Sequence, residues 1–133
     1  MDWNNDGKKD LISGQSYSGA RVNIFLNTGT DAAPVFSGKT YLQTGGVDFQ
    51  ASYQSTPFIV DWNNDGKKDV LCGEINGRIY YLENTGTDAA PVFSSSTFIQ
   101  DGAANLVASS RSSPMALDWD HDGAKDLIVG CYD

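Results

Sequence analysis

The sequence predicts an all-β chain built from four-stranded antiparallel blades, and three observations support this. Residues 2–10 recur unchanged at 61–69 and, with three changes, at 118–126, so the chain repeats at spacings of 59 and 57 residues. The apolar runs that flank these segments are short and bounded by turn residues. No segment has a sustained apolar period of 3.6 residues. Stacked repeats of this kind are typical of a β-propeller.

A second identical block defines the layout inside each repeat. Residues 27–37 and 84–94 have the same sequence and lie 57 positions apart. The two-residue difference in spacing therefore falls before these blocks, at 16–20 in the first copy and 75–77 in the second. Asn and Gly in the second segment favour a tight hairpin turn.

Each complete repeat is expected to contain four strands. In the second repeat they are expected at 55–63, 68–74, 78–84 and 91–100. Pro34 and Pro91 would each begin a fourth strand, where a missing amide donor costs little. Second strands are apolar on both faces, which predicts that each is sandwiched between neighbouring sheets.

These strands give one domain, 1–133, of about two and a quarter blades. Residues 1–54 are expected to form a first blade that lacks its first strand. A complete second blade follows at 55–111, and residues 112–133 supply the first two strands of a third blade.

The repeated nonapeptide has the spacing of a calcium-binding loop. Calcium takes about six to eight hard oxygen ligands, and here side-chain oxygens stand at the first, third, fifth and ninth positions. Glycine at the sixth position permits the sharp reversal that brings both ends around one ion. The seventh residue can contribute its backbone carbonyl. The expected ligands are Asp2, Asn4, Asp6, Lys8 and Asp10; Asp61, Asn63, Asp65, Lys67 and Asp69; and Asp118, Asp120, Asp122, Ala124 and Asp126, with Lys8, Lys67 and Ala124 binding through their carbonyls.

This interpretation has two alternatives. An EF-hand needs a glutamate at the twelfth position, where this chain has Ser13, Cys72 and Val129. Its flanks should also be helical, whereas these are strand-like. A metal-free turn is the second alternative, because Asp, Asn and Gly favour turns for local reasons. Three copies with every polar position filled favour the metal site.

Composition agrees with metal binding and disfavours other partners. Ten of the 17 acidic residues are the loop aspartates, and three calcium ions would bring the net charge of -8 to about -2. With nine lysines and arginines and no basic stripe, we expect no nucleic-acid binding. No apolar run is long enough for a membrane span. The start of the chain carries no signal peptide, and loops of this type suit the millimolar calcium outside cells, so an extracellular or secreted parent protein is expected.

The chain resembles the FG-GAP and VCBS repeats of integrin-type propellers. The resemblance rests on the apolar-Asp-Trp-Asn-x-Asp-Gly-x-x-Asp-apolar signature and on the Asn-Thr-Gly-Thr block before Pro-Val-Phe, and it covers nearly the whole chain. It implies blades whose calcium loops join the first and second strands on one face of a ring. It also implies a recognition role, because such propellers include adhesion domains and fungal lectins of the PVL-like type that bind sugars between blades.

Related propellers have about six to eight blades, so this chain is expected to complete a ring as a homo-oligomer. Three or four chains would supply six or eight blades. One difficulty is that nine strands per chain exceed the eight needed, so one copy of residues 7–14 or 125–131 must be displaced or paired elsewhere.

We therefore expect a non-enzymatic, calcium-binding recognition module, with carbohydrate as the ligand and itself as the partner. The alternative is a scaffold, either a fragment or an engineered repeat, whose activity is self-assembly; the near-identity of the repeats favours this alternative. No catalytic group is evident, because the single histidine, His121, lies in a metal loop and is expected on the surface.

A few other residues are candidates for a role. Trp3, Trp62 and Trp119 are expected in the core rather than stacked on sugar. Tyr17 and Tyr53 lie in polar loops and are either ligand platforms or incidental. Cys72 and Cys131 occupy non-equivalent positions, so free thiols are favoured over a disulfide. The sequence does not identify the residues of a ligand-binding site.

Overall fold

A computed structural model describes residues 1–132, and it confirms the predicted fold class. The described residues form antiparallel sheets and no helix, so none of them forms a helix that could cross a membrane. The strands are β1 (Leu11–Ser13), β2 (Asn23–Phe25), β3 (Thr40–Tyr41), β4 (Gln43–Thr44), β5 (Val47–Asp48), β6 (Thr56–Val60), β7 (Asp69–Gly73), β8 (Ile79–Leu82), β9 (Thr97–Phe98), β10 (Gln100–Asp101), β11 (Ala104–Asn105), β12 (Ser110–Leu117) and β13 (Asp126–Tyr132).

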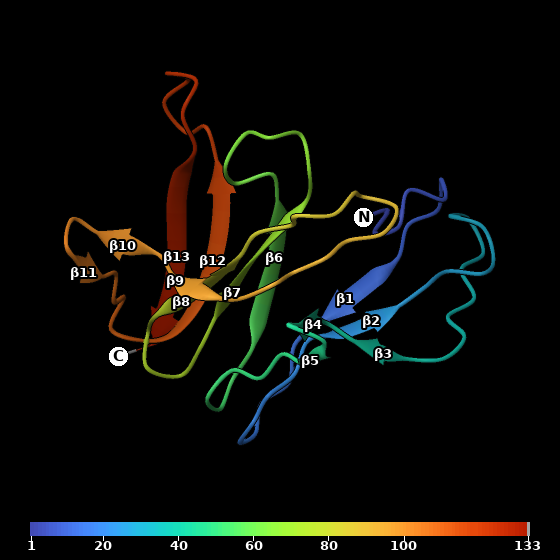
Figure 1. Cartoon of the computed structure of the whole chain (residues 1–133), viewed down its shortest axis with the longest axis horizontal. Coiled ribbons are helices and arrows are strands. Elements are labelled where there is room, and N and C mark those ends of the chain that lie inside the picture. The colour runs from blue at the N-terminus through green and yellow to red at the C-terminus, as the bar shows by residue number, and fades with distance from the viewer. Residues whose placement is uncertain (133) are drawn as a thin grey trace.

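Three main sheets follow one another across the molecule in chain order (Figure 1). The first has the order β1-β2-β3, the second has the order β6-β7-β8-β9, and the third is the β12–β13 hairpin. Two small hairpins, β4–β5 and β10–β11, follow the last strand of the first and second sheets. The second sheet therefore has the four antiparallel strands of a propeller blade.

The second strand of the complete blade is sandwiched, as its two apolar faces predict. All five residues of β7 are buried. Val70 and Cys72 belong to the core between the first and second sheets, with Val22, Leu42 and Phe49 of the first. Leu71, on the opposite face of β7, packs in a second core with Ile79 and Ala116. Strand alternation thus sends neighbouring residues of β7 into two different inter-blade cores.

The fourth strand is shorter than the expected range of 91–100, because only Thr97 and Phe98 pair with β8. Pro91 and its equivalent Pro34 lie in loops rather than at strand starts. The side chain of Asn84 explains this, since its Oδ1 accepts hydrogen bonds from the amides of Gly86 (3.0 Å) and Val92 (3.0 Å). The segment is folded onto itself and cannot extend along β8.

The three tryptophans differ in burial, so the expectation that all lie in the core was wrong for one of them. Trp3 is buried and Trp62 packs partly buried against the second core, but Trp119 is 68% exposed. Trp3 is covered because the next blade supplies Phe93. Among residues 1–132 no further blade follows β13 to cover Trp119 in the same way.

Candidate metal loops and inter-blade groove

The three nonapeptide loops lie along one edge of the molecule, at the top of Figure 1. One loop precedes β1, the second joins β6 to β7, and the third joins β12 to β13. Their positions follow from the repeat, because each loop leads into the second strand of a blade, and the second and third loops also follow a first strand. The strand register at each hairpin ends at the ninth loop residue, as in the pairs Val60–Asp69 and Leu117–Asp126.

The first aspartate organises each loop from within. Both carboxylate oxygens of Asp61 accept backbone amides, from Asp65 at 3.1 Å and from Gly66 at 3.0 Å. Asp2 and Asp118 make the same pair of contacts in their own loops. The fourth residue of each loop, Asn5, Asn64 or His121, has a positive φ, which Asn and His adopt more readily than most residues, and the glycine at the sixth position has a positive φ too.

The third and fifth positions continue this pattern. Asn63 Oδ1 accepts the amide of Asp65 at 3.0 Å, and Asp65 Oδ1 accepts the amide of Lys67 at 3.0 Å. Asp65 loses some solvent, which raises its pKa, but hydrogen bonds from the backbone and side chain of Lys67 outweigh this and hold the pKa below its ordinary value. The carboxylate therefore stays ionised over a wide pH range, as a metal ligand must.

The ninth aspartate ties each loop to the rest of its blade. Asp69 is fully buried, and its two oxygens accept the amides of Trp62 (3.0 Å) and Asn84 (2.8 Å). Asp10 does the same with Trp3 (2.8 Å) and Asn27 (2.8 Å). Each of these aspartates thus joins the second residue of its loop to the end of the third strand.

The structure brings several of the expected metal ligands together. In the third loop, carboxylate oxygens of Asp118, Asp120 and Asp126 all lie within 4.8 Å of one another. The first and second loops have the same backbone hydrogen bonds, with asparagine in place of the aspartate at the third position. Three hard oxygen donors at this separation fit a calcium ion.

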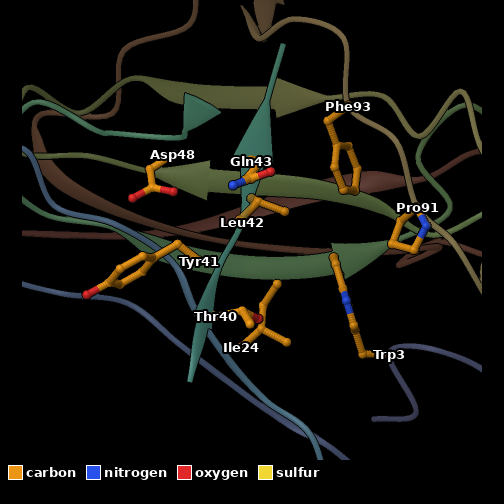
Figure 2. Close-up of a pocket in the computed structure, with 9 residues that line it drawn as sticks. All are labelled: Trp3, Ile24, Thr40, Tyr41, Leu42, Gln43, Asp48, Pro91 and Phe93. Carbon is orange, nitrogen blue, oxygen red and sulfur yellow. The ribbon is translucent and has the colours of Figure 1, made fainter. Parts of the chain in front are cut away.

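Sequence reasoning missed a groove between the first and second blades. It has a volume of about 470 Å³ and is lined by Trp3, Ile24, Thr40, Tyr41, Leu42, Gln43, Asp48, Pro91 and Phe93. Figure 2 shows Tyr41 and Asp48 at one end and Trp3, Pro91 and Phe93 at the other, with Leu42 between them. One sequence feature pointed to these groove residues: the segment Thr40-Tyr-Leu-Gln43 is repeated, with two conservative changes, as Thr97-Phe-Ile-Gln100.

The polar end of the groove carries fixed charge. Arg21 pairs with Asp48 at 3.1 Å, and its guanidinium lies 5.0 Å from the centre of the Tyr41 ring. The ammonium of Lys39 lies 4.9 Å from the same centre. A side-chain hydrogen bond with Lys39 is the main cause that lowers the pKa of the Tyr41 phenol. The groove therefore combines an apolar floor with hydroxyl, amide and carboxylate groups at one end.

The other residues considered from the sequence lie outside this groove. Tyr17 and Tyr53 are exposed, and His121 is exposed on the third loop, as expected. Cys72 is buried and Cys131 exposed, and both are free thiols. Burial raises the pKa of the Cys72 thiol to about 12, so it stays protonated in the folded chain.

Comparison with protein families found a match to the FG-GAP-like repeat over residues 61–129, which is more than half of the chain. Comparisons with curated proteins and with solved structures found no match. The matched segment runs from the second metal loop into β13, and it includes β7, β8 and β9 of the complete blade but not β6.

Proposed function

Because the chain belongs to the FG-GAP-like repeat family, we propose that it is a non-enzymatic, calcium-binding recognition module that binds carbohydrate in the groove between its blades. One observation carries this proposal: both walls of the groove are connected by hydrogen bonds to the ninth aspartates of metal loops. Trp3, in one wall, donates its amide to Asp10. Phe93, in the other wall, follows Val92. The amide of Val92 donates to Oδ1 of Asn84, and the amide of Asn84 donates to Asp69.

Calcium would be held in each loop by the residues expected from the sequence. In the third loop these include Asp118, Asp120 and Asp126, whose carboxylates already converge. When bound, the ion supplies positive charge that neutralises the repulsion among these carboxylates. The ninth aspartate connects the loop to the groove wall by hydrogen bonds, so a loop that is ordered by calcium also fixes the position of the wall. Calcium of this kind is a structural clamp.

The groove has the chemistry that carbohydrate recognition uses. Sugars present C–H faces that pack on aromatic rings and hydroxyls that need polar partners. Trp3, Tyr41 and Phe93 supply rings, while Thr40, Gln43 and Asp48 supply hydrogen-bonding groups. These residues are the ones we propose for the ligand, in an extracellular setting where calcium is plentiful.

A groove of related composition is expected beside the second blade. Phe98, Gln100 and Asn105 stand at the positions of Tyr41, Gln43 and Asp48 one repeat later. The change from Asp48 to Asn105 removes a charge, so the two grooves should differ in ligand preference.

A glycan array, read in calcium and then in chelator, tests the carbohydrate proposal. Signal that depends on calcium and disappears in Asp48→Ala supports it. As a matched control we suggest Asp101→Ala, because Asp101 is an exposed acid that does not line the groove. Silence on every glycan in calcium would sink the proposal.

Self-assembly is the second candidate function, and the faces of the end sheets favour it. Met115 and Ile128 lie opposite each other in the β12–β13 hairpin and are 43% and 36% exposed. Their equivalents one blade earlier, Phe58 and Leu71, pack in the second core. Leu11 of the first sheet is likewise 45% exposed, whereas its equivalent Val70 is buried.

We propose that a second copy of the chain covers these faces, head to tail, in a ring of three or four chains. Head-to-tail contact follows because the two faces correspond to the two sides of an inter-blade core that already exists within the chain. Light scattering tests this. A mass of three or four chains that falls in Met115→Lys supports the ring, and a single-chain mass at high concentration contradicts it.

A further inference from the structure

A lysine connects each blade to the metal loop of the blade before it. Lys68, the eighth residue of the second loop, donates from Nζ to the carbonyl of Asp2 (2.6 Å) and to Oδ1 of Asn5 (2.6 Å) in the first loop. Lys125, at the same place in the third loop, donates to Oδ1 of Asn64 in the second. The contact is therefore made at both junctions between blades.

An aspartate of its own blade also holds the lysine in place. The amide of Lys68 donates to Oδ1 of Asp88 (2.7 Å), and Nζ lies 3.5 Å from the other oxygen of that carboxylate. Its side chain is only 23% exposed. Lys9, its equivalent in the first blade, pairs with Asp31 but has a side chain that is 74% exposed.

The position of this charge has an electrostatic consequence. The first loop carries three carboxylates within nine residues, those of Asp2, Asp6 and Asp10, and these like charges repel one another when no ion is bound. The ammonium of Lys68 contacts the backbone carbonyl of Asp2, whose carboxylate is one of these proposed ligands, so its charge lies beside the loop and offsets part of that repulsion. A calcium ion entering the loop meets the same fixed positive charge and is repelled by it.

We infer that Lys68 is a built-in counter-ion for the first loop, which holds the two blades together without metal and lowers the calcium affinity of that loop. Lys125 has the same role toward the second loop. This inference rests on the calcium binding in the proposed function, and it deepens that proposal by naming what sets the affinity. It makes calcium uptake by one blade depend on the blade that follows it.

Lys68→Met tests the inference, because methionine keeps the apolar stem and removes the charge. The three tryptophans allow each loop to be followed separately, since each follows the first ligand of its loop and can sensitise Tb³⁺ bound there. In a Trp62→Phe, Trp119→Phe background, excitation at the long-wavelength edge of the indole band, where tyrosine does not absorb, leaves Trp3 as the reporter; this selection is needed because the Tyr81 hydroxyl donates to Asp69 in the second loop. Displacement of Tb³⁺ by calcium then gives the affinity of the first loop.

We expect Lys68→Met to raise this affinity by about three- to tenfold. Lys9→Met is the matched control: Lys9 is next to Asp10 in sequence, but its exposed ammonium points to Asp31, so we expect less than about a twofold change. In chelator, Lys68→Met should melt about 2–5 °C lower than its parent. This loss should shrink in saturating calcium.

The outcomes separate the two proposals. A merely structural lysine would, on removal, weaken metal binding and lower both melting temperatures alike, and that result overturns the inference while calcium binding stands. An equal rise in affinity from Lys9→Met overturns it as well, since net charge alone would then explain the effect. A parent chain that takes up neither Tb³⁺ nor calcium overturns the proposed calcium function, and the inference with it.

Discussion

The indole of Trp3 stacks on the ring of Phe93, with 6.1 Å between ring centroids and 25° between ring planes. Trp3 belongs to the first metal loop and Phe93 to the loop that follows the third strand of the second blade. This contact therefore joins a metal loop, the inter-blade core and the wall of the groove. Loss of it should affect all three.

Trp3→Ala is expected to destabilise the chain by about 3 kcal/mol, because it empties a buried inter-blade site. The repeat offers a matched control in Trp119, which has the same loop position but is 68% exposed. Trp119→Ala should change the free energy of unfolding by less than about 0.5 kcal/mol. Urea unfolding measures both, and equal losses would contradict the inter-blade role of Trp3.

Asp69→Asn should destabilise the second blade even in chelator. Both oxygens of Asp69 accept backbone amides in a fully buried site, and asparagine presents an amide group to one of these donors. A cost of about 1–3 kcal/mol is expected. Asp126→Asn is the comparison, because Asp126 is partly exposed and accepts the amide of Trp119. Thermal melting in chelator should show a clearly smaller loss for Asp126→Asn.

Acid should remove the stability contributed by Glu74, a fully buried carboxylate on the second repeat's hairpin. Burial raises its pKa, but hydrogen bonds from Ser52, Asn76 and Arg78 outweigh burial and hold the pKa below the ordinary value of 4.5. With a pKa depressed in the folded state, the contribution is present above pH 4.5 and is lost as pH falls through the folded-state pKa.

Glu74→Gln tests whether Glu74 causes this pH dependence. Glutamine fits the site, because Gln15 occupies the same position in the first repeat and accepts the corresponding amide of Arg21. The variant should lose stability at neutral pH and show a flatter decline below pH 4.5. Unfolding followed across acidic pH measures the slope. An unchanged slope would show that another carboxylate is responsible.

Thiol reagents should distinguish the two cysteines. Cys131 is exposed, whereas Cys72 is fully buried with a pKa raised to about 12. One thiol per folded chain should react quickly, and the second only after unfolding. Cys131→Ser should abolish the fast phase. A fast phase that survives in this variant would mean that β7 is not sandwiched as described.

The repeats made much of this fold predictable. Loop positions 1, 3, 5 and 6 make the same backbone hydrogen bonds in all three copies, because these bonds are local and local geometry follows from local sequence. The four strands of the second blade followed from apolar runs between turns. The shortening of the fourth strand was not predicted, because it depends on the side chain of Asn84 capturing the amide of Val92.

The features that depend on neighbouring blades could not be predicted. Trp3 and Trp119 have the same local sequence context, yet only Trp3 has a blade beside it that supplies an aromatic ring. The groove likewise takes one wall from Trp3 and Tyr41 and the other from Phe93, which lie far apart in the chain. Pairings of this kind follow from how blades stack, which a single repeat does not encode.

Calorimetric titration of calcium into metal-stripped chain tests the central claim most directly, because both groove walls are proposed to depend on the loops. The account predicts saturable binding that approaches three ions per chain, with a rise in melting temperature. It also predicts that Asp69→Asn removes one of these sites. No heat of binding at millimolar calcium, with a melting temperature indifferent to chelator, would contradict the account.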